Sequence, residues 1–329
     1  MSYKNFILLT FILLLKVNVY SQEKTSLYLE KTGFKKIDIK AKKDTIQIIT
    51  SSQDSQKPKP TILFLQGSTP MPVIFYRRNN AKTILPFDPK PYLDKYNFVI
   101  IARKGVSLVD AFDKDYVIKG PKEYELHNNL KYRTFQADET INYLYKQKWV
   151  KKDSIFVVGH SEGSDIGAKV SENNNKMTKL VCMSSNAFSR SSEYVFQTRL
   201  KCLSDNNDAV HQSEIDLIYQ DFKNIDDNIE IYRNEPEMYN WASYEKYNPY
   251  QSLQKFKRPL LVTYGSDDTK SLYNDLLPFL LDKTKLTLKV YPDYDHNYFK
   301  KEFDSQGKEI ESSYHWDEVF ADVVKWIEK

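Results

Sequence analysis

The sequence has few of the features that mark disulfide-rich, zinc-binding or nucleic-acid-binding proteins. Its 329 residues include only two cysteines, Cys182 and Cys202, which excludes a disulfide-rich scaffold, and no Cys/His cluster has zinc spacing, so no metal site is predicted. The 48 basic and 44 acidic residues nearly balance, and without a long basic run nucleic acid is a poor candidate partner. Hydrophobic residues make up 41% of the chain, which is enough for one large domain with a packed core.

One long apolar run is present, and it lies near the N-terminus. Lys4 precedes residues 6–15, which are apolar apart from Thr10. About ten residues are too few to span roughly 30 Å of hydrocarbon as a helix, and Val19 and Ser21 occupy positions that a signal peptidase reads. We therefore predict a signal peptide over residues 1–21, no stable membrane insertion after its removal, and a secreted or periplasmic protein. An uncleaved membrane anchor is the alternative.

Export would allow the two cysteines to oxidise. Cys182, however, falls within an apolar run, where a free thiol behaves as a small buried hydrophobe. The sequence leaves both a disulfide and two free thiols open.

Short apolar runs alternate with helical stretches over most of the chain. Fully apolar strands separated by helices are typical of a parallel sheet that is covered on both faces. An edge hairpin is predicted over residues 34–49, where polar and apolar side chains alternate, and a closing helix over 316–327, where apolar residues recur at helical spacing. The predicted core strands are residues 61–65, 98–102, 155–158, 180–183, 260–264 and 286–291.

A polar, aromatic-rich stretch interrupts this alternation between residues 188 and 258. It contains no convincing buried strand, and it is too long for an ordinary connection. We predict a helical cap insertion there, with the core domain formed by residues 22–187 and 259–329. Its many tyrosines could line a substrate pocket, although packing within the cap would account for them equally well.

The pentapeptide Gly159-His160-Ser161-Glu162-Gly163 follows one of the apolar strands and precedes a helical stretch. A serine held on a sharp strand-to-helix turn needs neighbours without Cβ atoms, and its hydroxyl is then exposed as a nucleophile. Glycine is scarce, with nine residues in the chain, so a chance match is improbable. The motif predicts Ser161 as the nucleophile.

A serine nucleophile needs a histidine base and an orienting carboxylate. His296 directly follows the last apolar strand and is the predicted base, with His315 as the alternative. The strand 260–264 is followed by Gly-Ser-Asp-Asp, which places Asp268 at the edge of the sheet as the predicted acid, with Asp267 as the competitor.

The oxyanion formed during acyl transfer needs two backbone N–H donors. Glu162, which follows the nucleophile, supplies one of them, and Ser68, in the loop after the strand 61–65, is the candidate for the other. Two nearby charges have less certain roles. Asp165 could simply cap the helix after the motif, and Arg103 could touch a substrate carboxylate but is expected to lie in a solvated loop.

These segments together resemble the α/β-hydrolase superfamily from about residue 31 to residue 329. Within it, a Gly-His-Ser-x-Gly motif is similar to those of bacterial esterases and prolyl-oligopeptidase-like enzymes. One departure is Gln66-Gly67, where His-Gly is usual in the oxyanion loop. The segments that carry the resemblance are residues 65–68, 159–163, 265–268 and 295–296.

The resemblance and the ordered residues imply an exported serine hydrolase that cleaves carboxylic esters or small amides through an acyl-enzyme and needs no cofactor. Its substrate would be a small ester or a short peptide. Two alternatives remain: a peptidase of the prolyl-oligopeptidase-like type, and a non-catalytic binding protein on a hydrolase scaffold. The sequence does not indicate the oligomeric state.

Overall fold

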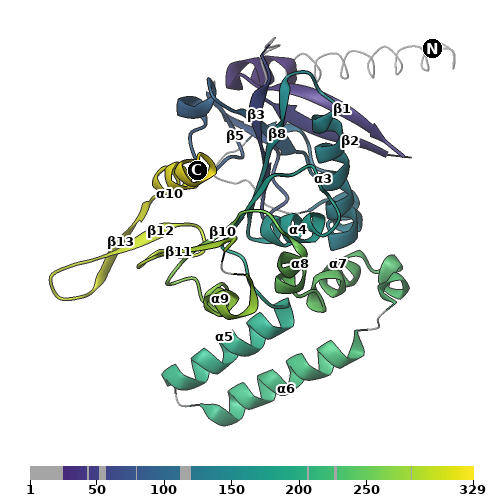
Figure 1. Cartoon of the computed structure of the whole chain (residues 1–329). Coiled ribbons are helices and arrows are strands. Elements are labelled where there is room, and N and C mark those ends of the chain that lie inside the picture. Colours follow the sequence, from purple (N-terminus) through teal and green to yellow (C-terminus); the bar gives the residue numbers. More distant parts are fainter. Residues whose placement is uncertain are drawn as a thin grey trace, which may run out of the picture.

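An eight-stranded sheet forms the centre of the protein in the computed structural model (Figure 1). The structure describes residues 25–42, 44–51, 57–78, 80–111, 120–205, 207–225, 228–282 and 284–329. The predicted signal peptide lies outside these residues. Within the described residues, no helix has the length and apolar character that crossing a membrane requires.

The strand order of the central sheet is β1-β2-β6-β3-β8-β9-β10-β11. β1 and β2 form an antiparallel hairpin that pairs antiparallel with β6, and all other neighbours are parallel. The predicted edge hairpin and all six predicted core strands are therefore confirmed. The bounds are β1 Lys35–Ala41, β2 Asp44–Thr50, β3 Lys59–Leu65, β6 Asn97–Ile101, β8 Val150–His160, β9 Lys179–Met183, β10 Leu260–Gly265 and β11 Leu286–Tyr291.

Alternate side chains of the buried strands pack into two separate cores, one on each face of the sheet. Phe64 and Val158 point into a core that the closing helix α10 (Trp316–Ile327) covers. Leu63 and Val157 point into the opposite core, beneath α3 (Leu130–Tyr145) and α4 (Glu162–Ser171). Burial on both faces explains why these strands are apolar throughout rather than at every second residue.

Helices are the only regular secondary structure in the described residues between β9 and β10. They are α5 (Arg190–Asp205), α6 (Asp208–Asn224), the short 3-10 helix η2 (Ile229–Asn234), α7 (Pro236–Glu245) and α8 (Pro249–Lys255). In Figure 1, α5 and α6 lie side by side at a distance from the sheet. α8 differs from them, because its Leu253 belongs to the core beneath α3 and α4.

The remaining elements are short. A small three-stranded sheet contains β4 (Ile74–Arg77), β5 (Asn80–Thr83) and β7 (Val109–Ala111), and β12 (Phe299–Phe303) pairs with β13 (Glu309–Tyr314). Further helices are α2 (Lys122–His127), α9 (Leu277–Leu280), η1 (Lys90–Tyr92) and η3 (Leu272–Leu276), and residues 25–32 are helical as well. Cys182 and Cys202 are both buried free thiols, which decides the question that the sequence left open.

Candidate active site

Ser161 lies on a sharp turn between β8 and α4. Its backbone has φ of +54° and ψ of −124°, a region that non-glycine residues rarely occupy and that stores strain. The turn packs closely against the end of β3, because a Cβ atom at position 163 would lie 1.9 Å from the carbonyl oxygen of Leu65. Gly163 is therefore required by contact with a neighbouring strand, which a motif read from sequence alone does not reveal.

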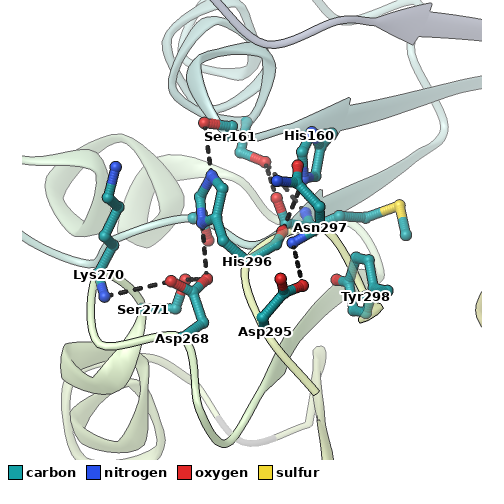
Figure 2. Close-up of polar contacts among 12 residues, drawn as sticks. His160, Ser161, Asp268, Lys270, Ser271, Asp295, His296, Asn297 and Tyr298 are labelled. Carbon is teal, nitrogen blue, oxygen red and sulfur yellow. Dashed lines mark hydrogen bonds and ion pairs between the residues drawn. The ribbon is translucent and has the colours of Figure 1, made fainter. Parts of the chain in front are cut away.

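The structure brings Ser161, His296 and Asp268 together (Figure 2). Asp268 Oδ2 accepts a hydrogen bond from His296 Nδ1 at 2.8 Å. With the ring proton held there, Nε2 can accept the Ser161 hydroxyl, which lies 3.0 Å away. All three side chains come from segments that follow strands at the carboxyl edge of the sheet.

Asp268 is held more firmly than its competitor Asp267. The carboxyl group of Asp268 is buried and also accepts hydrogen bonds from the Ser271 hydroxyl and the backbone N–H of Lys270. Asp267 is exposed and forms an ion pair with Lys301 at 3.3 Å. Only Asp268 therefore contacts the candidate base.

The loop that carries His296 is fixed at several points. Asp295 accepts the backbone N–H groups of Asn297 and Phe299, at 2.8 and 2.9 Å. The buried Tyr298 hydroxyl donates to the Thr263 carbonyl oxygen of β10 at 3.0 Å. The loop also packs on the strand that leads to Asp268, because a Cβ atom at Gly265 would lie 1.9 Å from the carbonyl oxygen of Tyr294.

The other histidines near the sheet edge play different parts. His315 precedes α10 and contacts Glu318 and Ser313. His160 Nε2 donates to the backbone carbonyl oxygen of His296 at 3.0 Å. Burial, together with the nearby His296 ring, lowers the pKa of His160 to about 4, so its imidazole stays neutral at ordinary pH and acts as a strut for the His296 loop.

Arg103 is not in a solvated loop, so that expectation was wrong. Its guanidinium is buried, forms an ion pair with Glu162 at 3.1 Å and donates to the carbonyl oxygens of Gln66 and Gly67. It also donates to Asn128. Arg103 thus connects the loop after β3 to the residue after the nucleophile, and the need to balance the buried Glu162 charge explains its burial.

Glu162 sits at the centre of a buried charge cluster. Burial opposes its ionisation, but Arg103, Arg190 and Arg133 together hold the pKa of its carboxyl group below the usual value. Arg190, at the start of α5, pairs with Glu162 at 3.2 Å. The sequence prediction used only the backbone N–H of Glu162 and missed this side-chain role.

Ser161 opens into a cavity of about 190 Å³. Ser68 and Glu162, the two predicted oxyanion donors, line it together with His296. Three tyrosines of the predicted cap, Tyr194, Tyr244 and Tyr247, line it as well, which gives a pocket role to some of the aromatics that packing could have explained. The other lining residues are Asp165, Ser184, Ser185, Asn186, Phe188, Arg190, Glu193, Pro249 and Lys270.

A second cavity, of about 400 Å³, adjoins the first. The two share Ser68, Glu162, Arg190 and Tyr244 in their walls. The second cavity lies beside α2 and α7, where Tyr124 and Trp241 line it. Within the described residues, no group of three or more His, Cys, Asp or Glu side chains is arranged to hold a metal ion.

Residues 133–271 match the family described as BAAT / acyl-CoA thioester hydrolase C terminal. The match includes Ser161 and Asp268 and ends before His296. No curated protein matches the chain at the level of sequence.

Several solved structures share the fold. DcsB, solved with its substrate analogue, is 13% identical with a TM-score of 0.56, over 90% of this chain and 98% of that one. The 2,6-dihydroxy-pseudo-oxynicotine hydrolase is 13% identical with a TM-score of 0.51, over 84% and 67%. The acylaminoacyl peptidase of Pyrococcus horikoshii is 15% identical with a TM-score of 0.53, over 90% of this chain but only 41% of the peptidase.

The chain has the α/β-hydrolase fold that its resemblance to the family implied, and part of it matches an acyl-CoA thioester hydrolase family model. The family match and the Ser–His–Asp arrangement together support an enzyme of the serine-hydrolase type.

Proposed function

We propose that the protein is a serine hydrolase that cleaves small carboxylic esters through an acyl-enzyme on Ser161. The observation that carries this proposal is His296, which contacts Ser161 Oγ through Nε2 and Asp268 through Nδ1. A serine hydroxyl is a weak nucleophile at neutral pH, and a base oriented in this way activates it.

In the proposed reaction, Ser161 Oγ attacks the ester carbonyl while His296 Nε2 accepts the hydroxyl proton. Asp268 stabilises the imidazolium that forms. The backbone N–H groups of Ser68 and Glu162 stabilise the oxyanion. Arg103 holds their two segments together, because its guanidinium donates to the carbonyl oxygen of Gln66 and pairs with the Glu162 carboxylate. His296 then protonates the leaving alcohol, and a water molecule activated by the same base releases the acid.

The two cavities suggest where the acyl group and the leaving group of a substrate bind relative to Ser161. The smaller one suits a compact acyl group, and the adjoining one has room for a larger leaving group. Esters demand least beyond the three reacting side chains, so they are the first substrate class. Thioesters, which the name of the matched family mentions, are acyl compounds that the same attack would cleave.

A peptidase that acts on short peptides is the second candidate. The adjoining cavity of about 400 Å³ favours it, because a peptide leaving group is larger than a simple alcohol. A non-catalytic binding protein is a weaker candidate, since such proteins usually lose a reacting residue and all three are present here.

A fluorophosphonate probe tests the catalytic proposal directly. We expect it to label the wild type and not Ser161→Ala. A folded wild type that stays unlabelled and hydrolyses no short ester would refute the proposal.

We also propose that the protein is exported, on the basis of Lys4 and the apolar residues 6–15. N-terminal sequencing of protein recovered from cell fractions tests this. A mature start near residue 22 outside the cytoplasm is expected, and an intact Met1 in the cytoplasm would contradict it.

A further inference from the structure

Two carboxyl groups in the cavity beside Ser161 have no part in the proposed acyl transfer. Asp165 lies on α4, four residues after Ser161 and thus about one helical turn away. Glu193 lies on the first turn of α5, on the other side of the cavity. Among the described residues, neither carboxylate forms an ion pair. Asp165 is the fourth residue of α4, whose N-cap is Ser161, so helix capping does not account for it.

The cations that line the same cavity do not neutralise these two groups. Arg190 is engaged on two sides, since it pairs with Glu162 at 3.2 Å and lies 3.9 Å from the centre of the Tyr244 ring. Lys270 is an exposed residue at the edge of the cavity and lowers the pKa of Glu193 only in part. Burial raises the pKa of Asp165 to about 7 in spite of Arg190, as expected for a carboxyl group that lacks a close cation.

Tyr244 supplies an independent sign that a polar ligand belongs here. It is 2% exposed and lines the cavity, yet its hydroxyl has no hydrogen-bond partner among the described residues. Buried hydroxyl groups are nearly always hydrogen-bonded, so an unpartnered one beside a cavity indicates a missing partner. Tyr194 and Tyr247 add aromatic side chains to the same wall, and aromatic rings attract cations.

We propose that this cavity binds the ammonium group of the substrate, so that the preferred substrates are esters or amides of small α-amino acids with a free amine. An α-ammonium group is bonded to the carbon next to the carbonyl that Ser161 attacks, so it would lie in the cavity that Ser161 and Asp165 both line. A volume of about 190 Å³ limits the acyl group to a small amino acid. The inference rests on the proposed function and names its substrate class.

The experiment compares three methyl esters at pH 7: alanine methyl ester, N-acetylalanine methyl ester, and methyl isobutyrate, in which a methyl group replaces the amine. The readout is the ratio of kcat/KM for the alanine ester to that for isobutyrate, measured in each variant, because the chemical difference between the two esters then cancels. Asp165→Asn and Glu193→Gln are each expected to lower this ratio roughly 10- to 100-fold, as for one hydrogen bond to a charged group.

Asp216→Asn is the matched control, because it removes an exposed carboxylate on α6, and it should keep the wild-type ratio. Two variants on different elements keep the test decisive if one of them fails to fold. An unchanged ratio in the folded variants, or a wild-type preference for the N-acetyl ester, would overturn this inference while the proposed function stands. Failure of the wild type to hydrolyse any of the three esters would instead refute the proposed function.

Discussion

The two walls of the cavity at Ser161 are built very differently. On the side of the central sheet, His296, Asp268 and Arg103 each make several hydrogen bonds that fix their positions. On the side of α5, Glu193 and Tyr194 line the cavity, and elsewhere on α5 and α6 large apolar side chains are exposed, with Leu203 at 77% and Leu217 at 60%. From this comparison we infer that residues on the sheet side carry out the proposed reaction, and that residues on the helical side select the substrate.

The largest expected effect concerns the base on the sheet side. His296→Ala should lower kcat for ester hydrolysis by roughly 10⁴- to 10⁶-fold, because Ser161 then has no group to accept its proton. Steady-state assays with a short ester measure it. His315→Ala is the control, since His315 contacts Glu318 and Ser313 instead. If His315→Ala lost activity and His296→Ala kept it, His315 would be the base instead.

Removing the charge of Glu162 should have the next largest effect. Glu162→Gln leaves the buried Arg103 without its carboxylate, which typically costs about 3–5 kcal/mol of unfolding free energy. Activity should fall too, because Arg103 also holds the loop of Gln66 and Gly67. Urea unfolding measures the stability. Glu309→Gln, which breaks an exposed ion pair with Lys301, should change it by less than about 1 kcal/mol. Equal losses in the two variants would refute the assigned role.

His160 should make the stability of the sheet side depend on pH. Its pKa of about 4 in the folded protein lies below its ordinary value of 6.5, so between these values the unfolded chain binds the proton and the native state does not. This contribution makes stability rise with pH from about 4 to about 6.5, by on the order of 2–3 kcal/mol.

His160→Gln removes this titration and keeps an N–H that can reach the His296 carbonyl oxygen. Urea unfolding across pH 4–7 should show a flatter increase in stability than in the wild type. His127→Gln, at a histidine on α2, serves as the control. Parallel curves for His160→Gln and the wild type would show that His160 does not carry the effect.

The smallest effect is expected on the outer surface of the helical side. Leu217→Ser replaces an exposed side chain of α6 and should change the unfolding free energy by less than about 0.5 kcal/mol. Ile166→Ala, in the core beneath α4, should cost about 2–5 kcal/mol. A large loss from Leu217→Ser would mean that this surface is covered in solution, and the contrast between the two walls would then be weaker.

The sequence was most informative where the local pattern and the tertiary environment agree. Strands buried on both faces are apolar throughout, so β3, β8 and β10 could be located without coordinates. The turn at Ser161 has its own glycine signature, and Asp268 and His296 each follow a strand directly. In parallel strands of one sheet, the carboxyl ends meet at one edge, which is why Ser161 and His296, 135 positions apart, could be predicted as neighbours.

Sequence was less informative for side chains whose position depends on a distant charge. Arg103 is a charged residue that follows a strand, so the sequence alone predicts a solvated loop. Only its pairing with Glu162 explains its burial. The strut from His160 to the His296 carbonyl oxygen likewise depends on a backbone atom that no motif encodes.

By itself, then, the sequence determined the α/β-hydrolase fold and the candidate nucleophile, base and acid, because periodicity and strand-end positions are local properties of the chain. The tertiary structure alone decided that Cys182 and Cys202 stay free, that Arg103 is buried, and that Asp165 and Glu193 line one cavity without an ion pair among the described residues. These outcomes depend on which groups come into contact in the folded protein and on how far water is excluded from them. The spacing of residues along the chain determines neither.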